Sequence, residues 1–156
     1  GFPETRFLLV GDGDRRAHLE ARVHAMGIQD RVVFAGLVSP GEIPRYTGLM
    51  DMLVHLSLRE GLPRTVVQAL ASGIPAVGVA LDGTPEVIRP GKTGILCPPD
   101  DAASVAEAII AMLSDPAKRR EMGAAGREFV RERFEWHCMV DQIEALYVKL
   151  SRAKNE

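Results

Sequence analysis

The residues with the clearest chemical potential form one short segment, Arg59-Glu60-Gly61-Leu62-Pro63-Arg64-Thr65. Gly61 lets the backbone approach a ligand closely, and Pro63 suits the first turn of a helix. A helix over residues 64–72 would then present free N–H groups and its positive dipole end, a combination that binds phosphate. Beside that helix start, the Glu60 carboxylate could accept hydrogen bonds from ligand hydroxyls.

The predicted helix sorts its side chains into two faces. Apolar residues recur at core spacing at Val67, Leu70 and Ala71. Polar residues lie on the other side at Arg64, Thr65, Gln68 and Ser72. Arg64 could bind phosphate, and Gln68 could bind sugar or ribose hydroxyls one turn further along. The same spacing also fits polar side chains that only face water and a Glu60 that is only a loop acid, and spacing alone leaves both interpretations open.

The elements that must position this segment follow from five short apolar runs, at residues 6–10, 31–35, 52–56, 74–79 and 94–97. These runs do not alternate apolar with polar residues, which is typical of strands buried on both faces of a parallel sheet. Helical segments follow most of the runs, so the chain reads as successive strand–helix–strand units. In such a sheet ligands bind beyond the carboxyl ends of the strands, and the segment around Glu60 falls there. His55 and Cys97, inside apolar runs, are expected to be core residues.

Three helices are predicted after the last strand. Asp101 is a candidate N-cap, and Asp115 followed by Pro116 is a second helix start. A final helix places apolar residues from Trp136 to Leu150 on one stripe. The predicted fold is α/β, a Rossmann-like parallel sheet of about five strands with helices on both faces and a C-terminal helical tail. No repeat or linker interrupts residues 1–156, which we interpret as one domain.

Composition narrows the function further. The chain has 156 residues, 46% hydrophobic and 26% charged, with a formal net charge of -2. These values are typical of a globular protein and give no reason to expect a nucleic-acid partner. The two cysteines, Cys97 and Cys138, have no metal-ligand spacing and fit a reduced, cytoplasmic protein. No apolar run approaches the roughly 20 residues of a membrane span, and neither a metal nor a cofactor is expected.

The ordered combination of motifs is specific. The segments EGLPRTVVQALASGIPAV and DGTPEVIRPGKTGILCPPDD, with LLVGDGDRRAHLEARVHAMGIQDRVVFAG upstream and DPAKRREMGAAGREFVRERFEW downstream, resemble the C-terminal domain of retaining family-4 glycosyltransferases of the GT-B fold. The resemblance covers nearly the whole chain. It implies a hexosyltransferase that, as part of a longer chain, moves a sugar from a nucleotide-diphosphate sugar to an acceptor with retention of configuration.

The resemblance also assigns roles to individual residues. Glu60 matches the first member of an acidic pair and is expected beside the donor sugar and diphosphate, as the catalytic residue. The second member, normally a ribose-binding Glu, is Gln68 here, so ribose binding is expected to be weakened or altered. Substrate-binding residues implied by the match or by the helix start are Leu37 and Val38, facing the nucleobase, and Gly61, Leu62, Arg64, Thr65 and Gln68. Pro63 stands where the family often has Gly, which removes one backbone donor.

Two parts of the family pattern have no counterpart in this sequence. One is the first strand–helix unit of the donor domain, which carries cations that bind the diphosphate, and the other is the N-terminal acceptor domain. Both are expected in the rest of a longer chain, so the fragment alone is expected to be inactive. Without that strand, the first and third strands are expected to pair with each other or to be covered by another molecule, including through self-association at the open sheet. A full-length enzyme attached peripherally to the membrane is an alternative that the sequence leaves open.

Two other classes of function stay open. One is a non-catalytic, stand-alone binding or assembly module, and the other is a sugar-nucleotide epimerase or phosphorylase of the same fold. A dinucleotide-dependent oxidoreductase is disfavoured, because Arg16 occupies the place of the third fingerprint glycine after Gly11 and Gly13.

Overall fold

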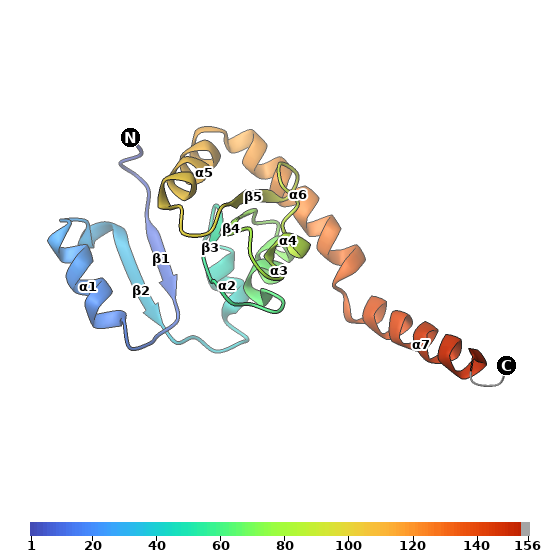
Figure 1. The fold of residues 1–156 in the computed structure, drawn as a ribbon. Coiled ribbons are helices and arrows are strands. Elements are labelled where there is room, and N and C mark those ends of the chain that lie inside the picture. Colours follow the sequence, from blue (N-terminus) through green and yellow to red (C-terminus); the bar gives the residue numbers. More distant parts are fainter. Residues whose placement is uncertain (154–156) are drawn as a thin grey trace. The chain divides into compact units, whose positions relative to one another are not determined.

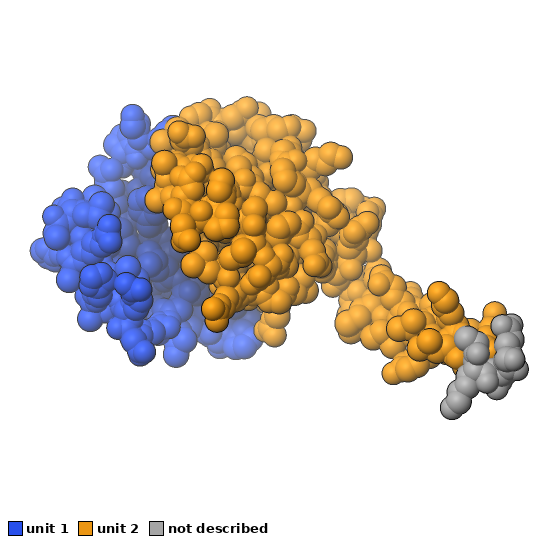
Figure 2. All heavy atoms as spheres, viewed as in Figure 1, with its two compact units in different colours: residues 1–46 blue, residues 47–156 orange. Residues whose placement is uncertain are grey.

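The computed structural model describes residues 1–153, and the chain divides into two compact units, Gly1–Tyr46 and Thr47–Glu156. Figure 2 distinguishes the two units by colour. Five parallel strands with flanking helices and a long C-terminal helix confirm the predicted fold class (Figure 1). The assignment of residues 1–156 to one partial domain stays a prediction.

Unit 1 is a single strand–helix–strand unit. Its elements are β1 (Phe7–Val10), α1 (Arg16–Ala25), a 3-10 turn at Gln29–Arg31 and β2 (Val32–Gly36), followed by α2 (Ile43–Thr47), which runs into unit 2. β1 and β2 are parallel, with Phe7 opposite Val32. Asp12, in the loop before α1, accepts a hydrogen bond from the Gly13 N–H at 2.8 Å and pairs with Arg16. This carboxylate therefore stiffens the loop and does not cap α1, whose N-cap is Arg15.

Unit 2 is built on a three-stranded parallel sheet in the order β3-β4-β5. Its elements are β3 (Leu53–His55), α3 (Arg64–Ala71), β4 (Ala76–Val79), α4 (Thr84–Val87), β5 (Gly94–Cys97), α5 (Ala102–Ser114), α6 (Pro116–Arg133) and α7 (Trp136–Ala153). All four residues of the central strand, β4, are buried. Ala76 packs into one hydrophobic cluster with α3 and α6, and Val77 packs into a second with α5. This two-sided burial explains the continuous apolar run in the sequence.

Among the described residues, β1 pairs with β2 alone and β3 pairs with β4 alone. The expectation that the first and third strands pair with each other is therefore wrong. Within the described part of the chain, β1 and β3 each form ladder hydrogen bonds with one neighbouring strand only. Each therefore keeps one edge without a ladder partner there. Covering of such an edge by another molecule, or self-association through it, stays a prediction.

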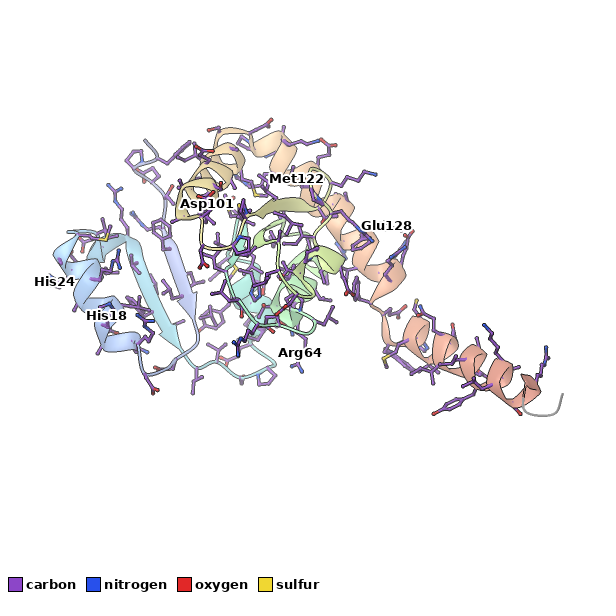
Figure 3. All side chains as sticks on the ribbon, viewed as in Figure 1. His18, His24, Arg64, Asp101, Met122 and Glu128 are labelled. Atoms are coloured by element: carbon purple, nitrogen blue, oxygen red, sulfur yellow. The ribbon has the colours of Figure 1, made fainter. Side chains whose placement is uncertain are left out.

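The predicted helix starts are confirmed. The Asp101 carboxylate accepts a hydrogen bond from the Ser104 N–H at 3.0 Å at the start of α5, where Figure 3 labels it. Asp115 accepts one from the Lys118 N–H at 2.9 Å, directly before Pro116. Both caps satisfy backbone donors that a helix end would otherwise leave unpaired.

In the described residues, no helix is long and apolar enough to cross a bilayer.

The C-terminal helix, α7, continues beyond α6 (Figure 1), and its large apolar side chains are exposed. Trp136 is 61% exposed, and the same stripe continues through Ile143 and Leu150, which are 44% and 57% exposed. The helix and its stripe were both predicted, but no other described element of unit 2 buries the stripe. Its apolar face is therefore unlike those of α5 and α6, whose apolar positions form the core.

Two glycines set the spacing between α3 and α6. A Cβ atom at Gly123 would overlap the carbonyl oxygen of Gly73, the second residue after α3. A Cβ atom at Gly126 would lie 2.6 Å from Leu70 Cδ2, one of the buried core atoms. The backbone of α6 therefore lies at a distance from the end of α3 that only glycine permits at position 123, whereas a side chain at position 126 would require Leu70 to move.

We predict that Gly123→Ala lowers the free energy of unfolding by about 2 kcal/mol or more, because overpacking against a rigid backbone outweighs the helix propensity that alanine adds. Chemical denaturation of wild type and variant measures the difference. The matched control is Ala124→Leu, which adds a larger side chain at the next, exposed position of α6 and should change stability by less than about 0.5 kcal/mol. Equal stability of Gly123→Ala and wild type would contradict this account of the α3–α6 contact.

Candidate functional site

The start of α3 has backbone donors that nothing in the described chain uses. Pro63 occupies the N-cap position, and no side chain caps the helix. The Val66 and Val67 N–H groups donate to the Pro63 carbonyl oxygen, at 3.0 and 3.2 Å. The N–H groups of Arg64 and Thr65 donate to no acceptor within the described residues. Two free donors and the positive end of the helix dipole therefore point to one place, which is suited to an anion.

The loop that carries Glu60 is pinned to the loop between β4 and α4. The Glu60 N–H donates to Asp82 Oδ2 at 3.2 Å, and the Gly83 N–H donates to the Glu60 carbonyl oxygen at 3.2 Å. A Cβ atom at position 83 would overlap the Gly61 carbonyl oxygen, so only glycine allows this approach. The backbone of Glu60 is therefore held through both its N–H group and its carbonyl oxygen by two adjacent residues more than 20 positions away in sequence.

These two loops border an open pocket with a volume of about 740 Å³. That volume lies within the roughly 300–1,000 Å³ typical of small-molecule sites. The lining combines apolar side chains, backbone, two carboxylates and one guanidinium, from Leu58, Arg59, Glu60, Gly61, Leu81, Asp82 and Gly83. Because it lies just past the carboxyl ends of β3 and β4, it occupies the position where ligands bind in parallel sheets.

The faces of α3 differ from the prediction by about one residue. Val66, Ala69 and Leu70 are the buried residues, whereas Val67 is half-buried and Ala71 is exposed. The predicted apolar stripe of Val67, Leu70 and Ala71 is thus wrong in phase, because Val66 is the residue that points into the core beside Leu70.

The polar face of α3 is exposed at every predicted position. Arg64 is labelled in Figure 3 at the start of the helix, and Gln68 follows one turn later. Neither the Arg64 guanidinium nor the Gln68 amide forms an ion pair or a hydrogen bond through its side chain in residues 1–153. Both groups are therefore free to bind a ligand, although exposure alone also fits side chains that only face water.

His55 lies next to Glu60. Its interpretation from the sequence as a core residue missed this contact. Its Nδ1 is 3.2 Å from the Thr65 hydroxyl, and its Nε2 is 3.9 Å from Glu60 Oε1. The side chain is 13% exposed, and Nε2 is buried without a hydrogen-bond partner. Burial lowers the pKa of His55 below its ordinary value, and the Glu60 carboxylate partly opposes that shift. Its place in the sequence could have indicated a role in the site, because His55 is the last residue of β3, the strand that leads to Glu60.

The remaining predicted site residues fall into two groups. Gly61 and Leu62 are exposed in the loop directly before α3. Leu37 and Val38 belong to unit 1, where they follow the end of β2; Leu37 is 83% exposed and Val38 is half-buried. Their predicted contact with a nucleobase stays a prediction.

Comparison with known proteins identifies the family. A family model described as glycosyl transferases group 1 matches residues 1–129. The chain belongs to this glycosyltransferase family. The domain corresponds to the C-terminal, donor-binding domain of the GT-B enzymes in it, which confirms the resemblance found in the sequence.

Curated relatives agree with this assignment. N-acetyl-alpha-D-glucosaminyl L-malate synthase of Bacillus anthracis is 34% identical over 149 residues, which cover 96% of this chain and 39% of that protein. A 2-deoxystreptamine glucosyltransferase of Streptomyces kanamyceticus is 34% identical, over 84% of this chain and 34% of its own length. The chain thus spans well under half the length of these relatives.

Solved structures share the fold. Sucrose-phosphate synthase from Thermosynechococcus elongatus superposes with a TM-score of 0.83 at 32% identity, covering 97% of this chain and 40% of that one. The Anabaena protein HepE in complex with UDP gives a TM-score of 0.87 at 25% identity, over 94% and 42% of the two chains. A second structure of the Anabaena protein contains UDP-glucose. This glycosyltransferase domain is therefore similar to proteins whose structures hold a nucleotide or a nucleotide sugar.

We predict that His55 makes the domain less stable in mild acid. Because the folded state lowers the pKa of His55 from its ordinary 6.5, the unfolded chain takes up this proton first as the pH falls. The stability that neutral His55 contributes is therefore present above about pH 6.5 and is lost as the pH falls towards the folded pKa. Denaturation curves of wild type and His55→Gln, at about pH 7.5, 6.5 and 5.5, measure the effect. Wild type should lose more stability than the variant, and parallel pH profiles would show that His55 does not titrate in this way.

Proposed function

We propose that this domain binds the nucleotide-diphosphate sugar donor of a retaining hexosyltransferase, which as a longer chain transfers the sugar to an acceptor. The observation that carries the proposal is the uncapped start of α3, where the Arg64 and Thr65 N–H groups are free, directly beside the pinned loop at Glu60. Similarity to a protein with bound UDP and UDP-glucose supports a donor of this class.

The proposed roles follow from the chemistry of each group. The N–H groups at the start of α3, the Gly61–Leu62 backbone and the Arg64 guanidinium bind the diphosphate. The Thr65 hydroxyl lies at the same helix start. The Glu60 carboxylate accepts hydrogen bonds from hydroxyls of the donor sugar, and Gln68 binds ribose. Leu37 and Val38 contact the nucleobase.

Transfer breaks the bond between the anomeric carbon and a phosphate oxygen and forms a bond from that carbon to an acceptor oxygen on the same face. The acceptor hydroxyl loses its proton in this step, and the oxygen of the departing diphosphate can accept it. Negative charge therefore grows on the departing diphosphate. Fixed donors aimed at that charge stabilise the transition state more than the ground state, which is how a helix start accelerates the reaction. The domain thus contributes positioning and electrostatic stabilisation.

We place the full-length protein in the cytoplasm. Cys97 is a buried free thiol and Cys138 a half-buried one. Unpaired thiols in these positions fit a reducing compartment.

We predict that Glu60→Ala in the full-length protein lowers kcat/KM for sugar transfer by at least about a hundredfold, the usual cost of removing one group that stabilises the transition state. The assay first requires the donor, which titration with a panel of nucleoside-diphosphate sugars identifies. Glu107→Ala is the matched control, because Glu107 is an exposed acid on α5 away from the loop at Glu60. Near-normal turnover of Glu60→Ala would refute the role proposed for Glu60.

We also predict that Gln68→Glu tightens binding of the nucleoside diphosphate about fivefold. A carboxylate accepts hydrogen bonds from two ribose hydroxyls, whereas an amide oxygen and NH₂ offer one acceptor and one donor group, and charge-assisted hydrogen bonds are stronger by about 1 kcal/mol. Isothermal titration of the full-length protein and its variant measures the change. Weaker binding by the variant would mean that position 68 does not face the ribose.

A further inference from the structure

We propose that His55 is a positioning residue that holds the Glu60 carboxylate through its Nε2–H group. The proposal rests on the proposed function, in which Glu60 contacts the donor sugar. It goes beyond that function because it assigns a role to a residue outside the motif, and it explains a buried atom that otherwise has no partner.

The first step is the environment of the imidazole ring. On one side, Nδ1 is 3.2 Å from the Thr65 hydroxyl, at the start of α3. On the other side, Nε2 is buried and forms no hydrogen bond. Native proteins rarely leave a buried polar atom unpaired, because it loses its contact with water without replacement. An atom without access to bulk solvent needs a partner inside the protein, either a protein group or an ordered water, and one protein group lies close by.

The second step is the identity of that partner. Glu60 Oε1 lies 3.9 Å from Nε2, beyond hydrogen-bond range but close enough for a small side-chain rotation to complete the contact. The Glu60 side chain is 37% exposed and free to rotate, whereas its backbone is fixed by Asp82 and Gly83. Hydrogen bonds in active sites are often long before the substrate binds and shorten in the complex.

The third step is the position of the proton. Thr65 can donate its hydroxyl proton to Nδ1, which leaves the proton of the neutral ring on Nε2, directed at the Glu60 carboxylate. The opposite tautomer would set the Nε2 lone pair against a carboxylate oxygen and is disfavoured. Burial also favours the neutral ring, since the pKa of His55 is lowered. The Thr65 hydroxyl, the His55 ring and the Glu60 carboxylate thus follow one another. They connect the start of α3, which is proposed to bind the diphosphate, with the carboxylate that is proposed to contact the sugar.

This arrangement has a kinetic signature. Glu60 is proposed to contact the sugar, and a nucleoside diphosphate has no sugar. Loss of the Nε2–H group should therefore impair transfer while leaving binding of the nucleoside diphosphate unchanged. A purely structural role in folding of the site would weaken both, because His55 also contacts the helix that binds the phosphates.

The first measurement is the imidazole NMR spectrum of the full-length protein, labelled with ¹⁵N-histidine. Wild type should show the neutral Nε2–H tautomer for His55, and Glu60→Gln should lower the His55 pKa, because the carboxylate that opposes the burial shift is gone. The Nδ1–H tautomer, or a His55 pKa that ignores Glu60→Gln, would overturn the proposal. This readout does not require activity.

The second measurement compares transfer by His55→Leu and His55→Gln. His55→Leu should lower kcat roughly tenfold to hundredfold, the worth of one charge-assisted hydrogen bond, with an unchanged Kd for the nucleoside diphosphate. His55→Gln retains an N–H donor near the place of Nε2 and should recover most of the loss. The control is His24→Leu, at an exposed position of α1.

The outcomes separate the two proposals. Normal kcat in His55→Leu, together with an inactive Glu60→Ala, overturns the role of His55 and leaves the proposed function intact. Failure of His55→Gln to recover activity, with a weakened Kd in both His55 variants, also overturns it in favour of a structural role. Normal turnover of Glu60→Ala refutes the proposed contact between Glu60 and the sugar, and with it the kinetic role of His55. Wild-type protein that neither binds a nucleoside diphosphate nor transfers a sugar overturns the proposed function itself, and the NMR measurement then still decides whether His55 holds Glu60.

Discussion

The two hydrogen bonds that join the Glu60 backbone to Asp82 and Gly83 are the constraint on which the site depends. They join the loops that follow two neighbouring parallel strands, β3 and β4, so the geometry of the sheet is transmitted to the pocket. Replacing Gly83 with any larger residue would push the Gly61 carbonyl away. The Glu60 carboxylate is therefore presented from a fixed backbone, and only its side-chain torsions remain to be set by its neighbours.

Those neighbours explain why His55 matters to the arrangement. A carboxylate on a rigid loop but in open solvent could adopt several rotamers, and each would meet a ligand differently. In the proposed arrangement the buried imidazole, 3.9 Å from Glu60 Oε1, limits this freedom. The ring also contacts Thr65 at the start of α3, and this contact on its other side fixes the tautomer that faces the acid.

The sequence predicted those features that depend on neighbouring residues. The caps at Asp101 and Asp115 need only a partner three residues away, and the buried strand at β4 needs only a continuous apolar run. The motif around Glu60 also gave the family, because its residue types and order are unusual. It was harder to predict which face of α3 is buried, since a helix of eight residues has barely two turns. Val66 and Val67 are the same residue type at adjacent positions, so the sequence does not show which of them packs into the core.

Features that depend on contacts between distant residues were not predictable. Asp82 and Gly83 are ordinary turn residues until β3 and β4 are paired, and only that pairing brings them to Glu60. His55 lies in an apolar run and was interpreted as a core residue, because nothing local shows that its ring lies between a helix start and a carboxylate. The division of the strands into two sheets likewise follows from tertiary arrangement, which apolar patterns do not encode.

The proline at the N-cap position of α3 has an energetic consequence. Asp or Ser in that place would close the end of the helix internally, whereas Pro63 leaves the first turn incomplete. An anion bound there would itself act as the missing cap, and would raise the free energy of unfolding by an amount that grows with the logarithm of its concentration above its Kd. Protease resistance and melting temperature would then rise when a ligand binds, so that a folding measurement could serve to screen for it.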